Sequence, residues 1–217
     1  VYTIENYAQA LSTFGEDTDN TVMLTTIKIL LDAGISKLFC VAPAILNDYP
    51  TTEDYKKAFQ TLEGIDTIGG VICDSNDFQV LIDFKESIQT SCENLKERIG
   101  FAGVSTVTGA TLVAEKLNSE RMVITTGLSN AYGTKIHSIC NTAAFMGVVL
   151  GVVSPTFNLN GSQIPEYIIP QGEPFSEQEI QNCLANGVCV FEQVPYNLEC
   201  IKAITTRQLT LCLPLIM

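Results

Sequence analysis

The stretch IGGVICDSNDFQVLIDFKESIQTSCENLKERIGFAGV, residues 68–104, decides the fold class. Its apolar residues change period twice, from a continuous run at 68–73 to a helical spacing over 77–99 and back to a short run at 101–104. Within 77–99 the apolar positions recur at intervals of three or four residues; they are Leu81, Phe84, Ile88, Cys92, Leu95 and Ile99. This spacing predicts an amphipathic helix between two buried strands, which is typical of a βαβ unit with parallel strands.

The same alternation continues on both sides of this unit. We expect helices at 20–33, 52–63 and 109–118, and strands at 37–43 and 121–125. Thr51 and Thr52 are candidate N-caps of the 52–63 helix, and Gly64 suits its end. Strands that alternate with helices over this much of the chain predict an α/β fold with a parallel sheet.

Residues 138–153, SICNTAAFMGVVLGVV, are apolar on nearly all sides. A membrane-spanning helix needs about 20 apolar residues, whereas the continuous apolar run here covers residues 143–153 and is interrupted by Gly147 and Gly151. We therefore expect a buried helix packed on the sheet, without membrane insertion. The two glycines, four residues apart, predict a close backbone approach.

The composition changes between residues 155 and 175, where prolines and glycines make an irregular crossing. After it, Ser176-x-x-Glu179 is a capping box that opens a helix. Residues 188–193 and 198–205 then predict a β-hairpin. We expect two regions, an α/β core domain over 1–154 and a second region over 155–217 with the crossing, a helix and the hairpin.

Charge and cysteine content exclude several classes of function. The 217 residues contain 12 Lys and Arg against 24 Asp and Glu, a net charge of −12, so nucleic acids and anionic membrane surfaces would be repelled. The eight cysteines form no CxxC pair, and residues 1–10 show no signal-peptide pattern, which favours reduced core thiols in a cytosolic protein. The alternatives are disulfides or a metal site formed by Cys183, Cys189, Cys200 and Cys212.

The residues that could carry chemistry form no familiar site. The single histidine, His137, lies three residues before Cys140, but the pair would come from one helical turn without an orienting third group. Phosphate-loop, dinucleotide-loop and GxSxG patterns are absent. Asp74 and Asp77 follow the 68–73 strand, where α/β proteins often place a site, although acids there are also common helix caps. We expect no catalytic, metal-binding or cofactor-binding residue; the alternative is a doubly wound small-molecule-binding domain or enzyme with a site near Asp74 and Asp77.

Four stretches, in this order, resemble the tail sheath proteins of contractile bacteriophages and related contractile injection systems. They are YKKAFQTLE (55–63) with GVIC (70–73) and the 77–99 helix, RMVIT (121–125) with AAFMGVVLG (143–151), SEQEIQNCLANG (176–187) with VCVFE (188–192), and the strand end ITTR (204–207). Together they cover about residues 50–207. None is a sharp catalytic motif, and it is their order that carries the resemblance.

The resemblance implies a structural role. Sheath subunits assemble as hexameric rings around a tail tube, between a baseplate and a tail terminator, and contract to drive the tube through a cell envelope. Their core is similar to a parallel α/β sandwich of the subtilisin type without the catalytic residues of the protease. For this chain it implies a virion tail protein, assembled in the cytoplasm of a bacterial host, whose partners include other copies of itself.

The chain departs from that family in length. Family members are usually much longer, whereas only residues 207–217 follow the strand end at Thr205-Thr206, so we expect a truncated C-terminal region. The last nine residues, LTLCLPLIM (209–217), are strongly apolar. They are expected either to dock on the core as a last strand or, if exposed, to form an association surface.

Overall fold

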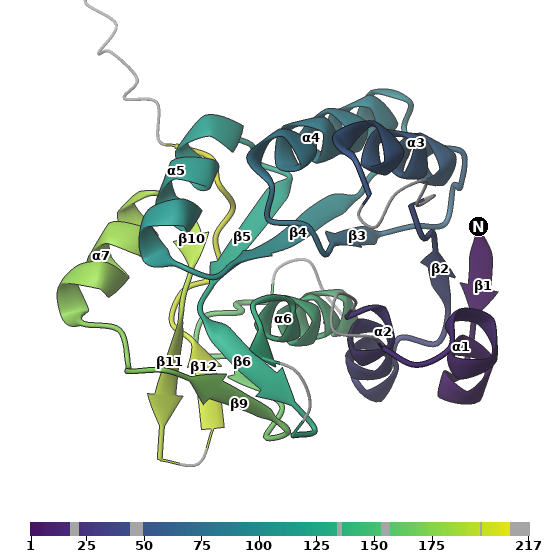
Figure 1. Cartoon of the computed structure of the whole chain (residues 1–217). Helices are drawn as coiled ribbons and strands as arrows, with labels where there is room; N and C mark the ends of the chain where they lie inside the picture. Colours follow the sequence, from purple (N-terminus) through teal and green to yellow (C-terminus); the bar gives the residue numbers. More distant parts are fainter. Residues whose placement is uncertain (18–21, 44–49, 134–135, 153–156, 196, 209–217) are drawn as a thin grey trace, which may run out of the picture.

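Figure 1 shows a computed structural model of the chain, which describes residues 1–17, 22–43, 50–133, 136–152, 157–195 and 197–208. Its centre is a four-stranded parallel sheet. In spatial order the strands are β10 (Val188–Cys189), β5 (Met122–Thr126), β4 (Ile99–Val104) and β3 (Gly70–Cys73). Helices α4 (Phe78–Glu93) and α5 (Val107–Leu117) connect β3 to β4 and β4 to β5. The predicted parallel α/β fold is confirmed.

Helices cover both faces of this sheet. One face packs against α3 (Thr52–Glu63), α4, α5 and α7 (Glu177–Ala185), and the other against α6 (Ile139–Gly151) and α2 (Met23–Asp32). Burial follows the alternation of side chains along a strand: Phe101 of β4 joins the core cluster around α6, and Ala102 joins the cluster around α4 and α5. The sandwich therefore has one hydrophobic core on each side of the sheet, with α1 (Tyr7–Phe14) packed outside α2.

Three smaller antiparallel sheets surround the central one. They are β1 (Tyr2–Ile4) with β2 (Leu38–Cys40); β6 (Leu128–Ala131) between β7 (Ile136–His137) and β9 (Ile168–Gln171); and β12 (Asn197–Cys200) between β11 (Phe191–Val194) and β8 (Gln163–Ile164). The hairpin of β11 and β12 was predicted. The expectation that the 37–43 strand belongs to the parallel sheet is wrong, because β2 pairs with β1 instead.

The region after residue 157 packs directly on the core. The capping box of α7 forms as predicted. The Ser176 hydroxyl accepts a hydrogen bond from the backbone N–H of Glu179, and the Glu179 carboxylate accepts one from the backbone N–H of Ser176. β10 then pairs in parallel with β5, at the edge of the central sheet opposite β3. The second predicted region thus supplies one strand of the sheet of the first.

Helix α4 ends earlier than its apolar spacing predicts. Leu81, Phe84 and Ile88 are buried as expected, but the helix stops at Glu93, and Leu95 is 90% exposed with a left-handed backbone (φ 63°). The reason is the buried Arg98, whose guanidinium donates hydrogen bonds to carbonyl groups at the end of α3 and just after it. The chain must leave the helix to place this side chain and to begin β4, so Leu95 is excluded from the core.

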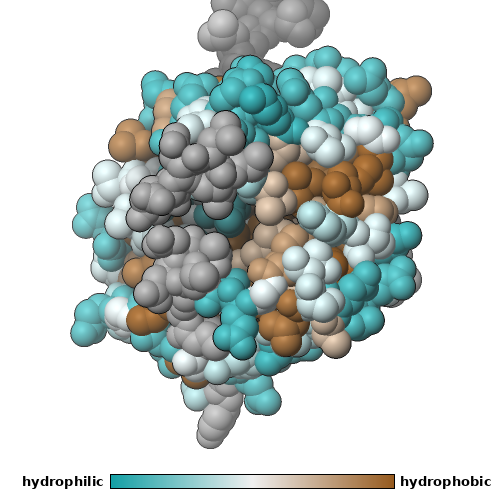
Figure 2. All heavy atoms as spheres, turned by 45° about the vertical axis from the view of Figure 1, so that its right-hand side comes forward, coloured by the Kyte–Doolittle hydropathy of each residue, from teal (hydrophilic) through white to brown (hydrophobic). Residues whose placement is uncertain are grey.

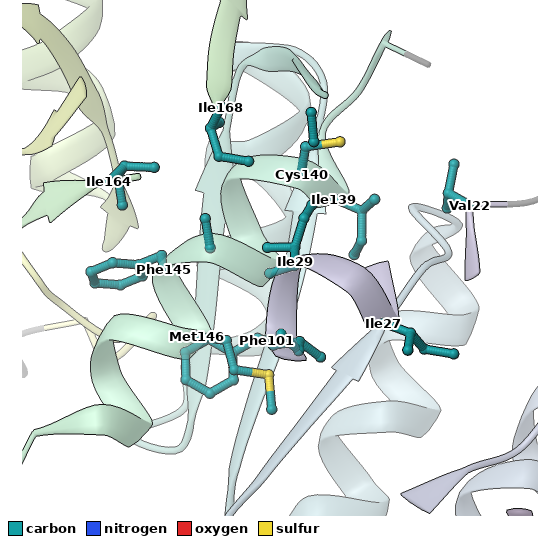
Figure 3. Close-up of a cluster of buried hydrophobic side chains, with 14 of the residues drawn as sticks. Val22, Ile27, Ile29, Phe101, Ile139, Cys140, Phe145, Met146, Ile164 and Ile168 are labelled. Atoms are coloured by element: carbon teal, nitrogen blue, oxygen red, sulfur yellow. The ribbon is translucent and has the colours of Figure 1, made fainter. Parts of the chain in front are cut away.

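Helix α6 is buried, as its apolar sequence predicts. Every residue from Ile139 to Gly147 is buried, whereas Val148 and Leu150, also expected in the core, are only half-buried. Figure 3 shows side chains of α6 meeting those of α2, β4, β8 and β9 in one cluster. In the part of the chain that the structure describes, no helix is both long and apolar enough to cross a membrane.

Of the two glycines expected to allow a close approach, Gly147 does so and Gly151 does not. A Cβ atom at Gly147 would lie 2.4 Å from the Cβ of Ala33, just beyond α2, whereas one at Gly151 would meet nothing within 4 Å. Packing of α6 against α2 therefore requires a residue without a side chain at position 147.

We predict that Gly147→Ala lowers the free energy of unfolding by about 1–3 kcal/mol, because α6 must move away from α2. Gly151→Ala is the matched control, and it should leave stability unchanged or raise it by up to about 1 kcal/mol through better helix propensity. Urea denaturation followed by circular dichroism measures both. Equal effects of the two substitutions would contradict the close approach.

Candidate functional site at the edge of the parallel sheet

The two acids that follow β3 have separate roles. Asp77 is the N-cap of α4, and its Oδ1 accepts hydrogen bonds from the backbone N–H groups of Gln79 (2.9 Å) and Val80 (3.1 Å). Oδ1 of Asp74 accepts a hydrogen bond from the hydroxyl of Tyr55 on α3 at 3.0 Å. Burial, together with the Asp74 carboxylate, raises the pKa of Tyr55. The helix-cap interpretation is confirmed for Asp77, and the two carboxylates serve different helices.

The pair of His137 and Cys140 lacks the properties of a nucleophilic site. Nδ1 of His137 accepts a hydrogen bond from the backbone N–H of Ile139 at the start of α6, with a distance of 3.0 Å between the two nitrogens. Cys140 is fully buried, and burial raises the pKa of its thiol to about 11. A nucleophilic cysteine needs a lowered pKa and access to a substrate. Both residues therefore have structural roles, His137 at the turn between β7 and α6 and Cys140 in the core.

The seven cysteines of the described chain carry free thiols. Burial raises the pKa of Cys40 and Cys183 to about 11 as well, which disfavours the thiolate form that reacts and binds metals. Among the residues described, no three His, Cys, Asp or Glu side chains are arranged to hold a metal ion. Cys212, the fourth member of the alternative metal set, lies outside the described residues.

A cavity of about 470 Å³, here called the edge cavity, runs along β3 on the side away from β4. Its walls come from both faces of the sheet and from β2; they include Ala58, Phe59 and Leu62 of α3, Ile27 and Leu30 of α2, and Met146 and Leu150 of α6. Because helices from both faces line one space, that space occupies the position of a further strand beside β3. Figure 2, in which the β1–β2 side is turned toward the reader, shows hydrophobic residues gathered on this face of the molecule.

The outer edge of β3 offers backbone groups to this cavity. The N–H of Ile99 binds the carbonyl of Gly69 at 3.0 Å, so the Gly69 backbone faces β4. Backbone direction alternates along a strand, and the N–H and C=O groups of Gly70 and Ile72 therefore point away from β4. Among the described strands only β4 pairs with β3. Within the described part of the chain, this edge of β3 thus has no strand partner where it meets an apolar space.

Sequence reasoning missed the edge cavity, because the predicted 37–43 strand would have filled it. The signal that could have warned against this is local. The 37–43 run ends at Pro43 and forms a strand of only three residues, Leu38–Cys40. Asp74 lines the edge cavity, together with Lys37, whereas Asp77 does not. Of the two acids that the sequence analysis considered, one therefore borders the edge cavity.

Comparison with known proteins gives similarity at the level of structure. No family model matches the sequence, and no curated protein matches it. The sheath of the anti-feeding prophage in its contracted state aligns with 96% of this chain at a TM-score of 0.64 and 10% identity. A chain in the baseplate structure of that particle aligns with 90% of this chain at a TM-score of 0.61 and 10% identity. A sheath tail protein of Desulfitobacterium hafniense aligns with 78% of this chain at a TM-score of 0.58 and 14% identity.

This chain has the fold of a contractile sheath subunit. The predicted sandwich of sheath type is therefore confirmed. Identities this low show the fold alone. The sheath-like chain spans 57% of the prophage sheath chain, 53% of the baseplate chain and 40% of the Desulfitobacterium protein, so each of these proteins contains further segments with no counterpart here.

We predict that Asp77→Ala lowers the free energy of unfolding by about 1 kcal/mol, because α4 loses its N-cap. Asp74→Ala is the matched control for removal of one carboxylate beside β3, and it should cost less than about 0.5 kcal/mol, because Asp74 is exposed. Urea denaturation of both variants measures the difference. A greater loss for Asp74→Ala than for Asp77→Ala would contradict the roles assigned to the two acids.

Proposed function

We propose that this chain is a structural subunit of the contractile sheath of a bacteriophage tail or a related injection system. One observation carries the proposal: solved sheath and baseplate chains align in structure with 78–96% of this chain. In this role copies of the chain assemble as rings around a tail tube and contract. Its partners are other sheath subunits, the tube protein, the baseplate and the tail terminator, in a tail assembled in the cytoplasm of a bacterial host.

The surface of the fold supports a role in assembly. Leu128, Ile136 and Ile169 are 37%, 54% and 50% exposed, on three neighbouring strands. Asn130 pairs with both Ile136 and Ile169 across the sheet, so these side chains share one outer face. Adjacent apolar side chains exposed on one sheet face are typical of a contact between proteins. This face suits a neighbouring sheath subunit.

The residues considered for catalysis support a structural role as well. Asp77, His137 and Cys140 each hold a helix start or lie in the core. We infer that the chain is not an enzyme and that the work of contraction comes from the lattice of subunits. In that lattice, residues 155–217 would form the start of the C-terminal sheath region, beyond the 1–154 core.

The edge cavity favours a second candidate, a small-molecule-binding domain. Its volume of about 470 Å³ lies within the range of ligand pockets, about 300–1,000 Å³. It also meets the carboxyl end of β3 at Asp74, where α/β folds bind ligands. The structural alignment still favours the sheath subunit, because it covers up to 96% of the chain, whereas the cavity concerns one edge of the sheet.

We predict that the complete gene product, expressed with its native flanking residues, forms regular tubes or stacked rings in negative-stain electron microscopy. The chain carries a net charge of −12, so assembly should increase between about 0.1 M and about 0.5 M NaCl as salt screens repulsion between copies. A monodisperse monomer at every salt concentration would contradict the sheath proposal and shift the weight to the small-molecule candidate.

A further inference from the structure

We propose that Leu95, just beyond the end of α4, anchors a contact between two copies of this chain by packing on the outer face of the β6–β7–β9 sheet of the neighbouring copy. The inference rests on the proposed function, because it requires copies that assemble. It adds the side chain that one copy contributes and the surface that receives it on the next.

The backbone at Leu95 is unfavourable for a leucine. The N–H of Leu95 binds the carbonyl of Cys92 at 3.0 Å, and the N–H of Lys96 binds the carbonyl of Ser91 at 2.9 Å. These two hydrogen bonds are those of a Schellman motif, which ends a helix with one residue in the left-handed conformation. Leu95 is that residue, with φ 63°. Glycine is usual at this position, because a Cβ atom strains the left-handed backbone.

Other helices of the chain end with a residue that tolerates this conformation. Gly15 ends α1, Gly34 follows α2 and Gly187 follows α7, all with positive φ. Asn118 ends α5 in the left-handed conformation as well, and asparagine adopts it more readily than other residues with a side chain. Leucine after α4 departs from this pattern. The end of the helix therefore does not explain the residue at position 95.

The side chain of Leu95 does not stabilise the fold either. Its exposed fraction, 90%, is the largest among the exposed large apolar residues of the described chain. A strained residue that buries nothing costs folding free energy, and such strain persists where it serves a function. For an apolar side chain, that function is burial against another apolar surface.

Ion pairs hold the loop that presents Leu95. Nζ of Lys96 pairs with Oδ1 of Asp66 at 2.9 Å, and the carboxylate of Glu97 pairs with Arg121. The two residues that follow Leu95 are therefore both tied to other parts of the molecule. A side chain presented by a fixed backbone loses little conformational entropy when it binds a partner.

The outer face of the β6–β7–β9 sheet is the receiving surface. Leu128, Ile136 and Ile169 lie exposed on its adjacent strands and form one apolar face. A sheet face of this kind is broad and has no projecting loop of its own, so a single leucine on a convex loop can pack between its side chains. Burial removes apolar surface from water on both copies.

Charge favours this pairing of surfaces. The residues two positions before and after Leu95 line a polar hollow that holds three cations and three carboxylates. In contrast, residues 161–200 contain six Glu and no Lys or Arg, and two exposed members, Glu166 and Glu173, flank β9. Among the described residues, Lys85 and Arg207 of the hollow form no ion pair, and neither do these two carboxylates. The hollow therefore offers cations to the acidic border of the receiving face.

The leucine and the receiving face lie at opposite ends of the central sheet. Leu95 precedes the start of β4 by four residues, and β6 begins two residues after the end of β5. Because β4 and β5 are parallel, the leucine lies at their amino ends and the receiving face follows their carboxyl ends. In Figure 1 α4 lies above the central sheet, and β6 and β9 lie below it.

This placement determines the kind of assembly. A contact between two different surfaces of identical subunits is heterologous, and it generates rings when it closes and filaments when it does not. Each copy would contribute its leucine to one neighbour and its sheet face to another. The contact thus fits a subunit that assembles into rings or tubes.

Two substitutions and a matched control test the proposal in the complete gene product with its native flanking residues. Leu95→Asn removes the apolar side chain but suits the left-handed backbone. Ile169→Lys charges the receiving face, and Ile136→Lys on the neighbouring strand is a second variant of that face. Leu112→Asn is the control, because Leu112 is 55% exposed in the middle of α5 and belongs to neither surface.

We predict that Leu95→Asn and the receiving-face variants each weaken association by about tenfold or more, while Leu112→Asn associates like the unmodified chain. Light scattering coupled to size-exclusion chromatography measures association over a range of protein concentrations. The midpoint of urea denaturation should stay the same or rise for Leu95→Asn, because strain is relieved, and it should fall for Leu112→Asn, because asparagine is a poor helix former. A residue with a merely structural role would not combine weaker association with unchanged or higher stability.

Mixing and crosslinking test which surfaces meet. An equimolar mixture of Leu95→Asn and Ile169→Lys should form a dimer that does not grow, because one chain supplies an intact face and the other an intact leucine. A chain that carries both Leu95→Cys and Ile169→Cys should give a ladder of trimers and larger species with a bismaleimide crosslinker. The two single cysteine variants, which measure the background from the native thiols, should not give this ladder.

Several outcomes would overturn the proposal. If Leu95→Asn assembles like the unmodified chain, Leu95 is not the anchor, and the sheath function stands without this contact. If Leu95→Asn weakens association but the receiving-face variants do not, or if the double cysteine variant gives no ladder, the leucine does not bind that face. A lower urea midpoint for Leu95→Asn would show that the leucine supports the fold. If the unmodified chain stays monomeric throughout, the contact and the proposed function fail together.

Discussion

Helix α6 has no polar face, so other elements of the molecule must cover it on all sides to keep its apolar side chains from water. The parallel sheet covers one side of it, and α2, β6, β8 and β9 cover the others. The contact with the sheet is close: a Cβ at Gly103 would lie 2.7 Å from the carbonyl oxygen of Ser138, and the hydroxyls of Thr125 and Thr142 are 2.7 Å apart. The central sheet is therefore joined to two of the outer sheets, those of β6 and β8, through one buried helix.

The same packing creates the unpaired edge of the sheet. Helices α3 and α6 line the cavity beyond β3 from opposite faces, but β2 pairs with β1, and no other strand of the described residues takes the next position. An unpaired edge strand between two apolar walls is a hazard in an isolated molecule, because it invites pairing with another chain.

The features that the sequence predicted correctly depend on neighbouring residues. The N-cap at Thr51 and the capping box at Ser176 formed because donor and acceptor lie within one helical turn. The helix at 139–151 was predictable because an all-apolar segment too short for a membrane must be buried. The features that failed depend on distant contacts. Leu95 keeps the helical spacing, yet Arg98 ends the helix by binding carbonyls more than thirty residues away. The spacing of apolar residues in the sequence does not predict which strand pairs with β2.

Hydrogen–deuterium exchange measured amide by amide tests most directly the claim that burial of α6 holds the layers together. Amides of residues 143–146 lie beyond the first helical turn and are buried, and they should exchange only through global unfolding, with an opening free energy equal to that of β4. Amides of the peripheral helices α1 and α7 should exchange with smaller opening free energies. If residues 143–146 exchanged through an opening with a clearly smaller free energy than the β4 amides, α6 would not be the element that joins the layers.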